Sequence, residues 1–442
     1  MARETHQRRA HTQESRERTC RRNDLADTSV QRIFAEDILL DPEIESYMRI
    51  DADYTRNALT ALVRINSVNP RFTGGTTSER EIAVYVADAL TALDVDVTQH
   101  EPEAGRVSVV GRLPGSGAGP SLILYAHMDT VGVDGMEAPF DAVVRDGRLY
   151  GRGSYDMKGG LAACLGAVHA LVRAPQSLPG DVILMAVADE EAASIGLTDL
   201  LSRYSADAAI VTEPTDLALC VAHKGFSWIE VRTRGRAAHG SRFEEGIDAN
   251  LRMGRFLARL EDLERELRSR PPHPLLGPPS LHAGVLAGGT GASIYAAESR
   301  VEIERRTIPG ETEVGVVAEI VRLLDALAGE DPSFRGEAKA LLTREPFETA
   351  PDGAVARAVT AAATQVLGRS PPVVGMSYWM DAAVFHAAGI DTVVIGPTGS
   401  GAHAVEEWVD VSSVLRLAEI LRVAAIRYPA SGAIAEQHPE AD

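Results

Sequence analysis

The stretch Ser121-Leu122-Ile123-Leu124-Tyr125-Ala126-His127-Met128-Asp129-Thr130 decides the fold. Its first six residues form a short apolar run, which is typical of a strand buried on both faces of a parallel sheet. Similar runs recur at 182–188, 208–211 and 392–395, and helices are expected at 160–171, 195–203, 354–367 and 414–428. Strands that alternate with helices indicate an α/β sheet covered on both faces.

Residues 222–342 break this alternation. Segments 226–232 and 300–305 alternate like half-exposed strands, whereas 250–267 and 314–327 read as amphipathic helices. The pattern predicts a small α+β domain inserted into the larger one. The expected division is an arm and lead-in at 1–50, a catalytic domain at 51–221 and 343–430, the inserted domain at 222–342, and a flexible tail at 431–442.

The charge balance excludes some partners. The 442 residues include 44 Lys+Arg and 63 Asp+Glu, which gives a formal net charge of −19. This acid excess argues against binding to nucleic acid or to an anionic membrane, and no apolar run is long enough to span a bilayer. Three cysteines cannot form a disulfide framework, so a cytoplasmic location is predicted. The arginine-rich arm reads as a solvated tail rather than as an export signal or a nucleic-acid arm.

Acidic and histidine residues gather just past the predicted strands, at 126–130, 154–160, 188–191, 212–214 and 401–403. In open α/β sheets, ligands bind at the carboxyl ends of the strands. Taken singly, each segment has an ordinary structural explanation, such as a helix cap or a structural histidine. Taken together, two imidazoles and three carboxylates suit a pair of zinc-like cations, with a further carboxylate as general base.

Three of these segments resemble the signatures of a known family. Ala126-His127-Met128-Asp129-Thr130-Val131 is similar to Gly-His-x-Asp-Thr-Val, 151–160 is similar to Gly-Arg-Gly-x-x-Asp-Met-Lys-Gly-Gly, and 189–191 is Asp-Glu-Glu. The family comprises zinc-dependent aminoacylases, acetylornithine deacetylases, succinyl-diaminopimelate desuccinylases and carboxypeptidase G, and the resemblance covers about 58–428. It implies a mainly parallel, zinc-exopeptidase-like catalytic domain with an inserted ferredoxin-like lid that also forms a dimer contact.

The resemblance also implies roles for individual residues. Asp156 would bridge two divalent ions, which are expected to be Zn²⁺, with Co²⁺ or Mn²⁺ as alternatives. His127 and Glu213 would complete one ion, and Glu191 and His403 the other. Asp129 would hydrogen-bond the imidazole of His127, and Glu190 would act as the general base.

Further roles fall on the lid and on the loops around the site. His239 would stabilise the oxyanion, commonly in the partner subunit, and Arg306 would grip a substrate carboxylate beside a solvated Arg305. Ser293 stands where many members have asparagine, and Gly399 belongs to a glycine-rich loop expected to line the pocket. Tyr378 and Trp379 either shape substrate choice or belong to the core.

These residues predict a two-metal hydrolase that cleaves the amide bond of an N-acyl amino acid and acts as a homodimer through the lid. Segments 303–306 and 377–381 look closest to the acetylornithine deacetylase-like group, which favours a deacylase. A carboxypeptidase or dipeptidase of the same family is the nearest alternative. A non-catalytic binding protein on this fold is disfavoured, because all five expected ligands and the base are present.

Overall fold

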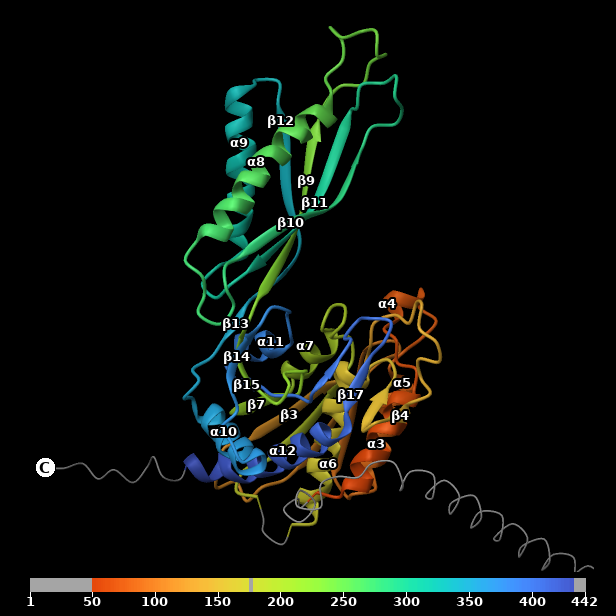
Figure 1. Cartoon of the computed structure of the whole chain (residues 1–442), viewed down its shortest axis with the longest axis vertical. Helices are drawn as coiled ribbons and strands as arrows, with labels where there is room; N and C mark the ends of the chain where they lie inside the picture. The colour runs from red at the N-terminus through yellow and green to blue at the C-terminus, as the bar shows by residue number, and fades with distance from the viewer. Residues whose placement is uncertain (1–49, 175–177, 433–442) are drawn as a thin grey trace, which may run out of the picture.

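The computed structural model of the chain describes residues 50–174 and 178–432. The predicted arm before residue 50 and the predicted tail beyond residue 432 lie outside the described residues. Figure 1 shows two bodies, a lower one built around a large sheet and an upper one in which two helices lie against a smaller sheet. Each body has its own hydrophobic core. The predicted α/β class with a separate lid is therefore confirmed.

The catalytic body is built on a mixed sheet with the strand order β1-β2-β6-β3-β7-β15-β8-β13, and β14 also pairs with β8. Parallel pairing joins β6 to β3, β3 to β7, and β7 to β15. The strands are β1 Asp96–Glu103, β2 Arg106–Leu113, β3 Leu122–His127, β6 Val182–Val187, β7 Ala208–Val211, β8 Leu219–His223, β13 Phe347–Glu348, β14 Val373–Met376 and β15 Asp391–Val394. Because the central strands are parallel, the segments that follow them meet at one edge of the sheet.

Helices cover the sheet. The strand that opened the sequence analysis, β3, is buried along its whole length: α6 and α12 pack against it, and Phe385 of α11 packs edge-on against its Tyr125. Burying a leucine-sized side chain contributes about 1.5–3 kcal/mol, which explains the unbroken apolar run. The helices of this body are α3 Ala52–Arg64, α4 Pro70–Thr73, α5 Arg80–Thr91, η1 Ser154–Lys158, α6 Gly159–Val172, α7 Ile195–Leu201, α10 Ala354–Leu367, α11 Ala382–Ala387 and α12 Val411–Gly432.

A small antiparallel sheet lies beside the main one, with the strand order β16-β17-β5-β4. Its strands are β4 Val143–Arg145, β5 Arg148–Tyr150, β16 Gly399–Ser400 and β17 Trp408–Asp410. Pairing of β17 with β5 joins the chain just before η1 to the chain just after His403. Two distant parts of the sequence are thereby brought to the same place.

The lid is an antiparallel sheet with the order β10-β11-β9-β12 and two helices packed on one face. Its elements are β9 Gly225–Arg234, α8 Ala249–Ser269, β10 Ser280–Gly288, β11 Glu298–Thr307, α9 Glu313–Glu330 and β12 Arg335–Arg344. Alternate residues of β9 and β11, such as Ile229, Val231 and Val301, are buried in the lid core. Among the described residues of the whole chain, no helix has the length and apolar character needed to cross a membrane.

Arg305 differs from its prediction as a solvated neighbour of Arg306. It is fully buried, and its guanidinium pairs with Glu311 at 2.5 Å and with Glu319 at 3.3 Å. Alternation along β11 places Arg305 on the same face as the buried Ile303, where an unpaired charge would be costly. The two carboxylates that compensate it come from the loop after β11 and from α9.

The chain crosses between the two bodies twice, from β8 into β9 and from β12 into β13. At the first crossing, a Cβ on Gly225 would lie 2.4 Å from the carbonyl oxygen of Arg344 at the second crossing, so the approach of the two segments requires glycine there. The crossings lie within a few residues of the proposed domain boundaries at 222 and 342.

His223 at the end of β8 is expected to make stability depend on pH. It is buried, its ring packs against Phe347, and burial lowers its pKa to about 4. Below pH 6.5 the imidazole is protonated in the unfolded chain but stays neutral in the folded chain, which favours unfolding. The free energy of unfolding is therefore at its full value above pH 6.5 and decreases as the pH falls toward 4. Between pH 7.5 and 5 the loss should be on the order of 2 kcal/mol.

Urea unfolding of the wild type and of His223→Gln at both pH values checks this prediction. Comparing the two proteins cancels the titration of all other groups. The wild type should lose more unfolding free energy than the variant between the two pH values. Equal losses would contradict it.

Candidate active site

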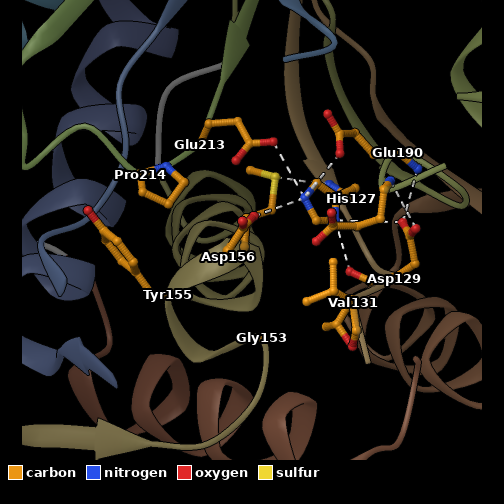
Figure 2. A network of polar contacts seen from close by, with 12 residues as sticks. His127, Asp129, Val131, Gly153, Tyr155, Asp156, Glu190, Glu213 and Pro214 are labelled. Atoms are coloured by element: carbon orange, nitrogen blue, oxygen red, sulfur yellow. Dashed lines mark hydrogen bonds and ion pairs between the residues drawn. The ribbon is translucent and has the colours of Figure 1, made fainter. Parts of the chain in front are cut away.

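The predicted site residues from three neighbouring strands meet at one edge of the sheet. His127 ends β3, Glu190 follows β6, and Glu213 follows β7. Figure 2 shows Glu190, Glu213 and Asp156 converging on the imidazole of His127. Nε2 of His127 lies 3.3 Å from Asp156, 3.4 Å from Glu213 and 3.9 Å from Glu190. Parallel pairing therefore produces the cluster from segments far apart in sequence.

Asp156 lies between two imidazoles. Its Oδ1 is 3.3 Å from His127, and its Oδ2 is 3.3 Å from Nε2 of His403. His403 in turn lies 3.2 Å from Glu191. The structure thus brings all five residues predicted as metal ligands together, with His127 and Glu213 on one side of Asp156 and His403 and Glu191 on the other.

The chemistry of the cluster fits divalent cations. Two groups of three side chains each have ligand atoms within 4.8 Å of one another. The first group is His127, Asp156 and Glu191, and the second is His127, Glu190 and Glu213. Oε1 of Glu191 is buried and has no hydrogen-bond partner among the described residues, although a buried carboxylate oxygen is costly to leave unpaired. Imidazole nitrogen and carboxylate oxygen are the donors that Zn²⁺ and similar ions accept.

The electrostatics of the cluster indicate the same need for positive charge. Burial and then the charge of Asp156 raise the pKa of Glu191 and of Glu213 to about 7, and burial raises the pKa of Glu190 well above its usual value. Hydrogen bonds to Asp156 and Glu191 raise the pKa of His403 to about 10. Burial opposes the charge on His127, but Glu213 and Asp156 outweigh it and raise its pKa as well. The cluster therefore holds protons in the absence of another cation.

Asp129 organises the loop that carries the two adjacent glutamates. Its carboxylate accepts the main-chain N–H groups of Glu190 and Glu191, each at 3.1 Å, and the amide of Asn69 at 2.8 Å. Its predicted hydrogen bond to His127 is less direct. Nδ1 of His127 faces the main-chain oxygen of Asp129 at 3.0 Å, and the carboxylate lies 3.6 Å away.

Glu407 is a site residue that the sequence analysis missed. Its buried carboxylate accepts the main-chain N–H groups of Tyr155 and Asp156, at 2.9 and 3.1 Å, and pairs with Arg152 at 2.6 Å. It thereby anchors the loop that presents Asp156. A glutamate close after His403 was the only available signal, and its distance from Asp156 in the sequence concealed the contact.

A second missed group lies under the Glu190–Glu191 loop. Asn69 donates to Asp189 at 3.0 Å, and Arg106 pairs with both Asp189 and Glu79. All four side chains are buried. The guanidinium of Arg106, on β2, thus connects Glu79, just before α5, to Asp189 at the start of the loop. Because the contacting pairs are 27, 83 and 120 residues apart in the sequence, no local pattern indicates the group.

Three predicted residues lie outside the cluster, on the lid. His239 and Ser293 are exposed neighbours: Gly240 donates its N–H to the main-chain oxygen of Ser293 at 2.7 Å, and Nδ1 of His239 lies 2.9 Å from Ser241. The chain that follows β9 lies at the end of the lid remote from the catalytic sheet (Figure 1). Arg306, near the end of β11 at the base of the lid, donates to Glu304 at 2.7 Å.

Gly399 lies close to the cluster. A Cβ at this position would lie 2.4 Å from the ring of Tyr155, the residue before Asp156. Only glycine therefore allows the ring to pack so closely against β16. A cavity of about 320 Å³ opens beside the cluster, and Asp156, Glu190, Glu191, Glu213 and His403 contribute to its wall.

The fold and this cluster define a metal-dependent hydrolase that acts on amide bonds. Residues 123–427 match the description "Peptidase family M20/M25/M40", and the chain belongs to this family. It is 32% identical over 332 residues to acetylornithine deacetylase from Myxococcus xanthus, covering 73% of this chain and 84% of the relative. The family resemblance seen in the sequence is therefore confirmed.

Two further proteins are similar. N-formyl-4-amino-5-aminomethyl-2-methylpyrimidine deformylase from Bacillus subtilis (strain 168) is 30% identical over 373 residues, covering 77% of this chain and 87% of the relative. The crystal structure of aminopeptidase PepT from Bacillus cereus ATCC 10987 superposes with a TM-score of 0.72 at 21% identity, over 86% of this chain and all of that chain. This structural likeness supports the fold.

Removing bound metal should destabilise the protein. Without cations, the carboxylates and imidazoles of the cluster lose their main source of compensation, and tight binding to the folded state alone stabilises it by mass action. Treatment with a chelator should lower the melting temperature by roughly 5 °C or more, measured by calorimetry. Added Zn²⁺ should restore it. An unchanged melting temperature in a protein shown to have lost its metal would refute the prediction.

Proposed function

We propose that the chain is a two-metal deacylase that hydrolyses the amide bond of an N-acyl amino acid. The observation that carries the proposal is the position of Asp156, one oxygen of which faces His127 and the other His403. Each imidazole also has a glutamate of its own nearby. A carboxylate shared between two such imidazoles is suited to bridge two cations. Zn²⁺ is the proposed metal, with Co²⁺ or Mn²⁺ as alternatives, because the donors are nitrogen and oxygen.

In this proposal, His127 and Glu213 would hold one cation, His403 and Glu191 would hold the other, and Asp156 would contribute to both. When bound, the cations would polarise the amide carbonyl and lower the pKa of the attacking water. Glu190 is the proposed base because it faces the same cavity and its neighbour Glu191 pairs with His403. Asp129 accepts the main-chain N–H groups of both glutamates, and this fixed main chain lets the side chain of Glu190 and that of Glu191 point in different directions.

Glu190 would act twice in each turnover. It first takes a proton from water as the water oxygen attacks the carbonyl carbon. It then gives that proton to the amide nitrogen as the C–N bond breaks, which yields a carboxylic acid and a free amine. Burial raises the pKa of Glu190 and nearby cations would lower it, and a pKa between these limits suits a group that must both accept and release a proton.

The deacylase assignment is supported by two relatives whose names describe removal of an acetyl and a formyl group. A carboxypeptidase or dipeptidase activity remains the alternative. Arg306 is proposed to bind the substrate carboxylate, with the Gly399 loop at the polar end of the substrate. Ser293 is proposed to reach the substrate in the partner's site, as His239 is, because it lies beside Gly240. A hydrolysis screen of N-acetyl and N-succinyl amino acids against dipeptides, on metal-loaded enzyme, decides between the two activities.

Adjacent glutamates provide a matched pair for testing the proposed roles. Glu190→Gln should keep its metal and lower kcat by about 10²–10⁴-fold, because only the base is lost. Glu191→Gln makes the same change one residue away but should lose metal, because it removes a ligand. Metal analysis and steady-state kinetics on both variants check this. Near-normal turnover of Glu190→Gln, or its loss of metal, would show that the roles are misassigned.

We also propose that the enzyme works as a homodimer through the lid. β10 is an edge strand of the lid sheet, and residues 282–288 are exposed on both faces. Val285 and Leu286 are 43% and 59% exposed, and an edge strand offers unpaired main-chain groups to another strand. In this arrangement, His239 would supply an oxyanion contact to the partner's site, which explains its distance from the cluster of its own chain.

Mixing two inactive variants tests a shared site. A Glu190→Gln subunit keeps His239, and a His239→Ala subunit keeps Glu190, so one of the two sites in a mixed dimer is complete. After subunit exchange, an equal mixture should recover about one quarter of wild-type activity if pairing is random. Replacing Glu190→Gln in the mixture by the double variant should give none. Failure to recover activity in demonstrably mixed dimers would place His239 elsewhere.

A cytoplasmic location is retained as a proposal. Cys164 and Cys220 are free, buried thiols, and burial raises the pKa of each to about 12. Such groups are unreactive and suit a compartment in which thiols stay reduced. The third cysteine, Cys20, lies outside the described residues.

A further inference from the structure

The cavity beside the cluster has an aromatic wall. Apart from the carboxylates and His403 of the cluster, the residues that line it are Tyr155, Pro214, Tyr378, Trp379 and Ala402. Figure 2 shows Tyr155 and Pro214 on the same side of Asp156. A volume of about 320 Å³ is at the small end of the range for pockets that enclose small molecules.

Two of the three aromatic side chains, Tyr378 and Trp379, have polar atoms that already donate hydrogen bonds to the main chain. The hydroxyl of Tyr378 donates to the main-chain oxygen of Pro214, and the indole N–H of Trp379 donates to the main-chain oxygen of Glu345 at 3.1 Å. Burial and the nearby carboxylate of Asp216 raise the pKa of the Tyr155 hydroxyl. The two main-chain contacts hold the rings of Tyr378 and Trp379 in place, so a ligand against these rings meets carbon surface rather than free donors.

The charged groups around the cavity also have partners or proposed roles. Every carboxylate that lines it belongs to the proposed metal site. The guanidinium of Arg344 lies 4.9 Å from the centre of the Trp379 ring and occupies one face of the indole. A side-chain ammonium placed here would meet a nearby positive charge and no uncommitted acid in the lining.

We propose that this cavity selects substrates that carry a flat, uncharged ring next to the scissile amide. The inference rests on the proposed function, which it deepens by naming the substrate class. Aromatic rings attract one another in offset or edge-to-face contacts and gain more than the burial of apolar area alone. An aliphatic chain gains only burial, and a cationic chain such as that of ornithine must also lose hydration while Arg344 already occupies one face of the Trp379 indole.

Matched substrates test the preference on metal-loaded enzyme. N-acetyl-L-phenylalanine, N-acetyl-L-norleucine and N-acetyl-L-ornithine differ only in the side chain, and N-benzoylglycine against N-acetylglycine tests a ring on the acyl side. In at least one of the two series, kcat/KM for the ring-bearing substrate should exceed that of its ring-free counterparts by about tenfold, which is the effect of two aromatic contacts. A preference for N-acetyl-L-ornithine, or no preference for a ring on either side, would overturn the inference.

Variants locate the effect. Tyr378→Leu and Trp379→Leu should lower the ratio of kcat/KM for the preferred ring-bearing substrate to that for its ring-free counterpart by about three- to tenfold, because a loss common to both substrates cancels in the ratio. Tyr204→Leu serves as the control because Tyr204 is also half-buried and hydrogen-bonded, to His100, but lies outside the cavity. Equal losses on ring-bearing and ring-free substrates would show that the wall is merely apolar.

Binding separates this inference from the proposed function. If the enzyme hydrolyses none of these amides, the deacylase proposal fails. Calorimetric titration with the ring-bearing compounds and their ring-free counterparts then still tests the cavity. Tighter binding of a ring-bearing compound, weakened by Trp379→Leu, would support the aromatic preference without turnover, and equal binding would refute it.

Discussion

The structure depends on holding Asp156 between two imidazoles at the edge of the central sheet. One of its oxygens faces His127 and the other His403, while Glu191 and Glu213 flank the pair. Gathering carboxylates in a buried space is unfavourable unless positive charge compensates them. The raised pKa values of the two glutamates express this cost. Bound cations would meet that constraint in a metal-dependent hydrolase, and the surrounding fold keeps these side chains in position.

Much of the surrounding structure restrains the loops that carry these groups. Glu407 holds the main chain at Asp156, and Asp129 holds the main chain at Glu190 and Glu191. A third support runs from Arg106 through Asp189 to Asn69 beneath the same loop. Hydrogen bonds to charged groups are stronger than neutral ones, so these supports limit the movement of the site. The lid, by contrast, meets the catalytic body at two chain crossings.

Local patterns were sufficient for the elements that bury apolar residues. The runs around Leu122 and Val182, and the helix at Ala354–Leu367, were predicted because burial imposes a periodic or continuous apolar sequence. The lid edge strands β10 and β12 escaped prediction because they are largely exposed and carry no such pattern. Arg305 was misplaced for a related reason. Its burial depends on acids that lie elsewhere in the chain.

The sequence by itself determined the fold class, the family and the residue types gathered at the sheet edge, because motif spacing and strand composition are local properties. Only the tertiary structure decided that Glu407 anchors Asp156, and that Tyr155, Tyr378 and Trp379 share one cavity. It also placed the segment of His239 away from the cluster of its own chain. These contacts join residues that are up to about 250 positions apart in the sequence. The order of the strands and the packing of the helices bring them together, and the residues next to them in the sequence do not indicate the contact.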